Sequence, residues 1–160
     1  MHTYYLLLGT NKGDRIKNLD KAIDEIEKQI GEIMNKSSIY ETEPWGLEDQ
    51  PDFLNMVLAV HSKYIPEKVF EITKSIESQA GTIKYVKWGP RIMDIDILYC
   101  DDMVIDSEHL NIPHKQIYTR NFTLIPLIEI AGEMIDPVKK LSLDELYDIC
   151  DDDKEVFIYE

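Results

Sequence analysis

Two aspartates, Asp94 and Asp96, stand two positions apart in the apolar segment MDIDILYC, residues 93–100. This segment predicts a buried strand, and residues two apart in a strand point to the same face with Cα atoms roughly 6.5–7 Å apart. The two carboxylates therefore converge, while Ile95 and Ile97 point to the opposite face. Because desolvated carboxylates repel each other, the pair favours a divalent cation close to both, and oxygen ligands of this kind suit Mg²⁺.

The residues just before the pair favour a phosphate ligand. Trp88, Gly89, Pro90 and Arg91 place an aromatic ring, a turn and a fixed cation beside the acids, and an arginine fork can bind phosphate oxygens that a metal also holds. Taken alone, the Asp-x-Asp pattern of residues 94–96 more often marks the solvated end of a strand. Four further basic residues could add to the site: Lys84, Lys87, Lys115 and Arg120. Each of them alone would more often be an ordinary solvated side chain.

Other catalytic patterns are missing from the sequence. It contains neither a GxxxxGK phosphate loop nor a GxGxxG turn after a strand, which argues against P-loop and dinucleotide-fold enzymes. His2 and His61 are isolated and more typical of structural histidines. His114 is the exception, because it lies in the loop segment IPHKQIYTR with Arg120 close behind.

The elements that must position these residues follow from hydrophobic periodicity. Between Asp14, a candidate N-cap, and Gly31, a candidate C-cap, apolar residues recur at the spacing of one helical stripe. The expected elements are a strand over 3–8, this helix, strands over 32–42 and 53–62, a helix from Pro66 to near Gly81, and a strand over 93–100, with a loop over 44–51. The order β-α-β-β-α-β predicts an α+β, ferredoxin-like sandwich with a mainly antiparallel sheet.

The remaining third of the chain is expected to cover the other face of the sheet. A short hairpin is predicted in 101–106, a loop ending at Pro113 follows, and helices are predicted near 123–131 and 142–149, the second opened by Ser142. With no repeat or linker in the sequence, residues 1–160 are expected to form a single domain.

Composition limits the possible partners. Seventeen Lys and Arg against thirty-one Asp and Glu give a net charge of −14, which would repel nucleic acids at long range.

No apolar segment approaches the roughly 20 residues of a membrane helix, and nothing resembles a signal peptide. Cys100 and Cys150 are widely spaced and are expected to be reduced thiols. We therefore expect a cytoplasmic protein that binds neither nucleic acid nor membrane, and a monomer because no apolar stripe is left over.

Seven segments, in order, resemble hydroxymethyl-dihydropterin pyrophosphokinase, the folate-pathway family that moves pyrophosphate from ATP to a pterin alcohol. They span roughly residues 4–137, and their order makes coincidence implausible. The segments are GTN (9–11), SSIYETEPWG (37–46), DQPDFLN (49–55), IESQAG (76–81), WGPRIMDIDIL (88–98), IPH (112–114) and RNFTLIPLIEIAG (120–132).

The resemblance implies a function and a set of site residues. Asp94 and Asp96 would hold two Mg²⁺ ions and, with Arg91, would form the catalytic group. The 6-hydroxymethyl-7,8-dihydropterin would bind between Phe53 and Phe122, with further pterin contacts from Thr42, Glu43, Pro44, Trp45 and Asn55. ATP, the co-substrate, would contact Glu77, Lys84, Trp88, Arg91, Ile97, His114, Lys115 and Arg120. The loops over 43–50 and 81–91 would close over both substrates.

One segment departs from the family pattern. The family usually has an arginine directly after the glycine of IESQAG, whereas this chain has Thr82, followed by Lys84 and Lys87, in a segment that is one residue shorter. An alternative is therefore a catalytically impaired protein that binds nucleotide and pterin. A third hypothesis, an acidic metal-binding or interaction module, rests only on charge and the aspartate pair.

Overall fold

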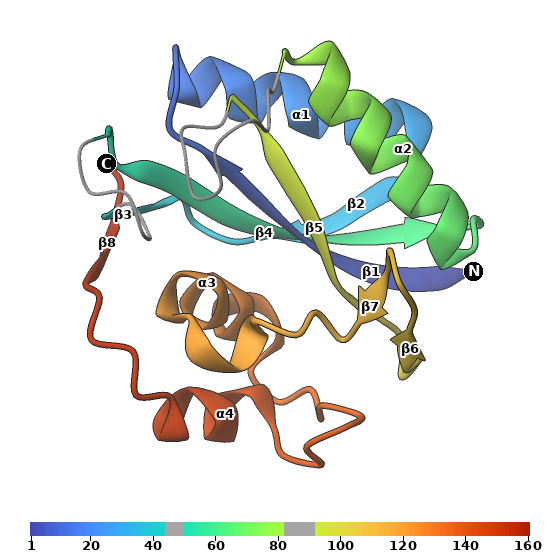
Figure 1. The fold of residues 1–160 in the computed structure, drawn as a ribbon, viewed down its shortest axis with the longest axis vertical. Helices are drawn as coiled ribbons and strands as arrows, with labels where there is room; N and C mark the ends of the chain where they lie inside the picture. Colours follow the sequence, from blue (N-terminus) through green and yellow to red (C-terminus); the bar gives the residue numbers. More distant parts are fainter. Residues whose placement is uncertain (44–49, 82–91) are drawn as a thin grey trace.

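The computed structural model describes residues 1–43, 50–81 and 92–160, and Figure 1 shows how its elements are arranged. The first part of the chain forms β1 (His2–Thr10), α1 (Arg15–Gln29), β2 (Glu32–Lys36), β3 (Tyr40–Thr42), β4 (Phe53–Ser62), α2 (Pro66–Gln79) and β5 (Asp94–Cys100). The second part forms β6 (Ile105–Asp106), β7 (Asn111–Ile112), the 3₁₀ helix η1 (Ile117–Thr119), α3 (Asn121–Ala131), α4 (Leu143–Ile149) and β8 (Val156–Ile158).

The main sheet is antiparallel, with the strand order β5-β1-β4-β3-β8, and β2 also pairs with β4. The β-α-β-β-α-β order predicted from periodicity is confirmed, with β1 between β4 and β5. Strands β6 and β7 form a separate two-stranded ribbon.

The sheet separates two hydrophobic layers, because side chains alternate between its faces. Helices α1 and α2 cover one face, where Leu6, Leu8, Ile95 and Ile97 belong to the larger core (Figure 1). Helices α3 and α4 cover the other face, where the smaller core lies. The prediction that the C-terminal helices cover the second face is confirmed.

Helix boundaries follow the predicted caps with one correction. The Asp14 side chain accepts the Lys17 N–H at 3.1 Å, and Ser142 forms a capping box with Glu145. Gly31 is not the C-cap of α1; Ile30 occupies that position. A Cβ on Gly31 would lie 1.9 Å from the His61 carbonyl oxygen, so glycine is needed there because β4 passes close by.

The single strand predicted over 32–42 is two strands. The pairing advances by four residues from Lys36 to Tyr40 but by only three along β4, from Leu58 to Asn55. One extra residue therefore bulges from the edge, and the Ser37 hydroxyl accepts the Val57 N–H at 2.9 Å there.

Two further differences lie beyond β5. Residues 101–106 do not form a hairpin by themselves: Ile105 and Asp106 pair with Ile112 and Asn111. Strand β8, which the sequence pattern did not predict, pairs with β3. Its three residues are too few for period-two alternation to be recognised.

Candidate active site

Both predicted aspartates lie on the sheet face that α3 and α4 partly cover. Gly9 pairs with Asn55 on one side and Asp94 on the other, and Leu7 in the same way pairs with Val57 and Asp96. Further along, Leu7 and Val57 are buried beneath α3 and α4. The face therefore has an apolar part under the helices and a polar part that contains Asn55 and the two half-buried aspartates.

Gly9 leaves space that Asn55 uses. A Cβ on Gly9 would lie 2.8 Å from Asn55 Nδ2 and 3.9 Å from Phe53 Cδ1. Asn55 is buried, accepts the Thr42 hydroxyl at 3.3 Å through Oδ1, and directs its Nδ2 toward the Leu8 carbonyl at 3.5 Å. The Asn55 amide is thus held in one orientation beside Phe53.

Phe122, the second predicted stacking ring, lies in the first turn of α3, and both rings are half-buried. The Arg120 guanidinium lies 5.2 Å from the centre of the Phe122 ring. The start of α3 is fixed by Asp152, whose carboxylate accepts the Asn121 N–H and whose carbonyl accepts the Asn121 side-chain amide, both at 2.9 Å.

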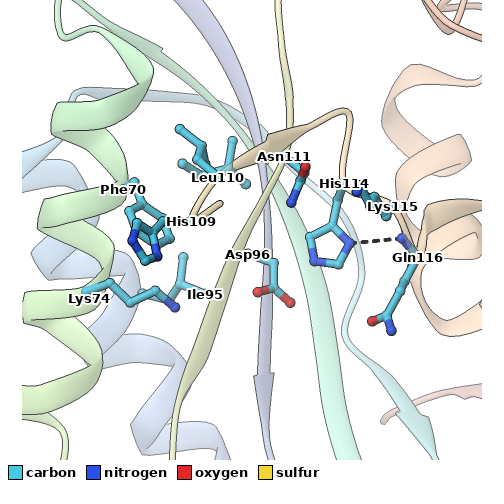
Figure 2. A pocket seen from close by; sticks show the side chains of 11 residues that line it. Phe70, Lys74, Ile95, Asp96, His109, Leu110, Asn111, His114, Lys115 and Gln116 are labelled. Atoms are coloured by element: carbon cyan, nitrogen blue, oxygen red, sulfur yellow. Dashed lines mark hydrogen bonds between the residues drawn. The ribbon is translucent and has the colours of Figure 1, made fainter. Parts of the chain in front are cut away.

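Asp96, His114 and Arg120 are brought into electrostatic contact. Burial lowers the pKa of the His114 imidazole, the Asp96 carboxylate opposes this, and Arg120 and Lys74 add to it. Burial also lowers the pKa of Arg120, against the effects of Asp96 and Asp152. His114 is therefore neutral near pH 7. Its Nδ1 accepts the Gln116 N–H at 3.2 Å (Figure 2). In the neutral ring Nε2 therefore carries the proton.

A pocket of about 390 Å³ adjoins Asp96, within the size range of small-molecule sites. Figure 2 shows that its walls come from α2, β5 and the segment 109–116. The Oδ1 atom of Asn111 is buried without a hydrogen-bond partner among the described residues. The lining residues are Phe70, Lys74, Ile95, Asp96, Ile97, His109, Leu110, Asn111, His114, Lys115 and Gln116.

Other predicted site residues have evident structural contacts. Glu77 is buried, accepts the Ile95 N–H at 2.7 Å and pairs with Lys74 at 3.1 Å, so it links α2 to β5 beside the pocket. The side chain of Ile97 is buried in the larger core and also borders the pocket.

Two predicted contact residues are exposed and form ion pairs. Lys115 is exposed and pairs with Asp106 at 3.5 Å. Glu43 is also exposed, and it pairs with Lys154 at 3.7 Å. Five predicted site residues, and most of the two predicted closing loops, lie outside the described residues: Pro44, Trp45, Lys84, Trp88 and Arg91.

Several residues of this region were not predicted from the sequence. Lys74 and Phe70 line the pocket from α2, with the Lys74 amine 5.1 Å from the Phe70 ring centre. Asn11 is buried and donates to Gln50 Oε1 and the Pro51 carbonyl, both at 2.9 Å, just before Phe53. The only sequence signal for Asn11 was its place in GTN. Lys74 and Phe70 had the ordinary spacing of a helix face.

Comparison with known proteins identifies the family. Residues 5–132 match the family model of 7,8-dihydro-6-hydroxymethylpterin-pyrophosphokinase. The chain belongs to this family. The resemblance seen in the sequence is thereby confirmed over four fifths of the domain predicted for residues 1–160.

Relatives of this pyrophosphokinase cover most of the chain. It is 41% identical over 145 residues to the 2-amino-4-hydroxy-6-hydroxymethyldihydropteridine pyrophosphokinase of Aquifex aeolicus, which covers 91% of this chain and 90% of that protein. It is 40% identical over 131 residues to the Bacillus subtilis pyrophosphokinase, covering 81% of this chain and 78% of that one.

The fold of this pyrophosphokinase has solved counterparts. A Plasmodium falciparum HPPK-DHPS chain crystallised with pteroate matches 92% of it with a TM-score of 0.77 and 18% identity. The present chain spans 44% of that longer chain, so the likeness concerns the fold of one part. Among the described residues, no helix is long and apolar enough to cross a membrane.

Proposed function

We propose that this member of the pyrophosphokinase family transfers pyrophosphate from ATP to 6-hydroxymethyl-7,8-dihydropterin, giving AMP and the pterin diphosphate in folate biosynthesis. The observation that carries the proposal is the position of the aspartate pair. The polar part of the sheet face, with Gly9, Asn55 and Phe53, lies on one side of the pair. The pocket that His114 lines lies on the other side.

Asp94 and Asp96 have the chemistry of a magnesium site. They offer hard oxygen donors on one sheet face, and the negative charge of Asp96 acts on both His114 and Arg120. We propose that this pair holds two Mg²⁺ ions, which when bound would neutralise phosphate charge and act as Lewis acids.

The pterin would occupy the polar part of the sheet face. Phe53 and Phe122 would stack on its flat ring, while Asn55, held by Thr42, would offer a fixed amide to the ring edge. Glu43, Pro44 and Trp45 would close this side. The gap beside Gly9 supports this placement, because a side chain there would displace the Asn55 amide.

ATP would occupy the pocket beside Asp96. His114 and Arg120 would contact the phosphates, with Lys84, Trp88, Arg91 and Lys115 as further contacts, and Glu77 and Ile97 would shape the wall. A donor on the nucleotide would satisfy the buried Oδ1 of Asn111, which costs free energy while it is unpaired.

The chain's contribution to the reaction would be positioning and charge. The pterin CH₂OH oxygen would attack the β-phosphorus in line. A new P–O bond would form to the pterin as the bond between the β-phosphorus and the α,β-bridging oxygen breaks; AMP would leave with that oxygen, and the hydroxyl proton would pass to solvent. Arg91 would stabilise charge on the transferred group. His114, neutral and oriented by the Gln116 N–H, would donate through Nε2.

An AMP assay tests the proposal. ATP, Mg²⁺ and the reduced pterin alcohol should give equal amounts of AMP and pterin diphosphate, and EDTA should stop turnover until Mg²⁺ is restored. Formation of ADP or inorganic phosphate without AMP would contradict the proposal. Calorimetry that detects binding of both substrates without turnover would instead support an impaired binding protein.

The same proposal includes a monomer that acts in the cytoplasm. The net charge of −14 opposes self-association. Sedimentation equilibrium should then give a mass near 18.7 kDa, and a dimer mass would contradict the monomer.

A further inference from the structure

A second group of ligating side chains lies at the far end of the same strands. The proposed active site is at the Gly9 end of β1 and the Asp94 end of β5, whereas Tyr4 pairs with Cys100 near the opposite end. There His2, Cys100 and Asp101 gather, at the start of β1 and the end of β5.

The three side chains are within reach of one ion. One ligand atom from each, the imidazole nitrogen, the thiol sulfur and a carboxylate oxygen, lies within 4.8 Å of the other two. His2 Nδ1 is 2.8 Å from Asp101 Oδ2, and Asp101 Oδ1 accepts the Thr3 N–H at 2.9 Å. That backbone contact fixes the carboxylate, so only small movements are needed to bring the ligands to the separation of roughly 3.3–3.8 Å around a tetrahedral ion.

Access and charge at the cluster suit a cation. The His2 and Asp101 side chains are 24% and 36% exposed, whereas Cys100 is fully buried. The thiol therefore lies beneath the surface, and the other two ligands are accessible to solvent. The charged groups that act on the thiol, Asp101 and Glu67 of α2, are both carboxylates, and the N-terminal ammonium is a cation that acts on Asp101.

We infer that His2, Cys100 and Asp101 form a binding site for a borderline-soft divalent transition metal, with Zn²⁺ as the preferred ion. The mixed sulfur, nitrogen and oxygen set suits Zn²⁺ and Co²⁺ and disfavours Mg²⁺, which prefers oxygen ligands alone. The ion would bind three protein ligands and a water, and would link the start of β1 to the end of β5. The site is separate from the aspartate pair and independent of the proposed reaction.

Binding exchanges protons and hydrogen bonds. The His2–Asp101 hydrogen bond is replaced by bonds from both groups to the ion, and the imidazole proton on Nδ1 moves to Nε2 or is released. Burial raises the pKa of the Cys100 thiol to about 11, with Asp101 and Glu67 adding to the rise and a hydrogen bond with Tyr4 opposing it. The thiol binds the ion as a thiolate, and its proton passes to solvent.

Cobalt titration of the full chain, carrying no added histidines, tests the inference. One equivalent of Co²⁺ should give a thiolate-to-cobalt charge-transfer band that Zn²⁺ abolishes by displacement, since such a band requires sulfur coordination. Cys100→Ser should remove the band, whereas Cys150→Ser should keep it with the Kd changed less than about twofold. His2→Gln and Asp101→Asn should each weaken binding at least about tenfold.

Matched controls separate loss of a ligand from loss of the fold. Asp101 has a φ of 50°, a conformation that Asn also tolerates, and Asp102→Asn serves as the neighbouring carboxylate control. Circular dichroism and the Tm without metal should match the wild type. Three outcomes would each overturn the inference: cobalt binding without the band, a band that persists in Cys100→Ser, or a cobalt Kd weakened as much by Asp102→Asn as by Asp101→Asn. None of these measurements depends on enzyme turnover.

Discussion

The role proposed for Asp94 and Asp96 rests on their shared sheet face, since both are half-buried and Asp96 also lines the pocket. Asp94→Ala or Asp96→Ala should lower kcat/KM for AMP formation at least about 100-fold, since each removes a ligand for phosphate-neutralising ions. The free energy of unfolding should change by less than about 1 kcal/mol, because removing one of two neighbouring like charges relieves repulsion.

Asp102→Ala is the matched control for both variants. Asp102 is exposed in the turn after β5, and its replacement should leave turnover unchanged. Retention of more than about a tenth of the wild-type kcat/KM in Asp96→Ala would contradict a metal-binding role for the pair.

Gly9 is expected to act on the pterin through Asn55. In Gly9→Ala the new methyl would lie 2.8 Å from Asn55 Nδ2, and the Asn55 amide, held by Thr42 and Leu8, could not move without losing those contacts. The KM for the pterin should rise about tenfold, which is about 1.4 kcal/mol, with a smaller change in the KM for ATP.

A double-mutant cycle separates this steric effect from general damage. In an Asn55→Ala background the added methyl meets no amide, so Gly9→Ala should cost at least about 1 kcal/mol less there. Additive effects would show that Gly9 does not act through Asn55.

One buried carboxylate, that of Asp136 between α3 and α4, joins η1 to the sheet. Asp136 is fully buried, accepts the Tyr99 hydroxyl of β5 at 2.5 Å and the Tyr118 hydroxyl of η1 at 2.8 Å, and also accepts the N–H groups of Val138 and Lys139. Burial and this carboxylate raise the pKa of both tyrosines. The contact holds η1, which directly precedes Arg120 and Phe122, against β5.

Removing that carboxylate should destabilise the protein strongly. Asp136→Ala leaves four donors without their acceptor and should cost about 3 kcal/mol or more in urea unfolding, whereas Tyr118→Phe removes one charged hydrogen bond and should cost about 1.5–3 kcal/mol. Asp148→Ala, at an exposed position of α4, should cost less than about 0.5 kcal/mol. If Asp136→Ala also cost less than about 0.5 kcal/mol in the free energy of unfolding, the helices would be held by apolar packing alone.

The C-terminal segment completes the sheet even though it lies beyond the family match. Strand β8 covers the outer edge of β3, the Tyr159 N–H donates to the Ile39 carbonyl at 2.8 Å, and the Arg15 guanidinium lies 5.5 Å from the Tyr159 ring centre. Deleting residues 153–160 would leave the β3 edge unpaired next to Thr42. The truncated chain should melt several degrees lower and self-associate in sedimentation velocity, because exposed strand edges pair with other chains.

Phe157→Ser tests whether pairing or the ring is responsible. Phe157 is 60% exposed, so its replacement should leave both the Tm and the sedimentation coefficient close to the wild type. If this variant behaved like the truncated chain, the ring and not the backbone pairing would stabilise the edge.

The sequence by itself determined the order and type of the main elements and the shared face of Asp94 and Asp96. Those features are local: a helical stripe, an N-cap or an alternation in a strand is complete within about ten neighbouring residues. The family resemblance is likewise carried by short segments whose order is read directly along the chain. The roles assigned to Arg91 and the other residues of 82–91 stay predictions.

Only the tertiary structure decided which distant residues meet. Gly9 lies between Asn55 and Asp94 because β1 pairs with both β4 and β5, and a shift of one residue in either register would turn a side chain to the other face. The meeting of Asp96 with His114 and Arg120, the bulge between β2 and β3, and the pairing of β8 depend in the same way on contacts between segments far apart in the chain. Register and packing are properties of strand pairs and layers, so no single segment of the sequence contains them.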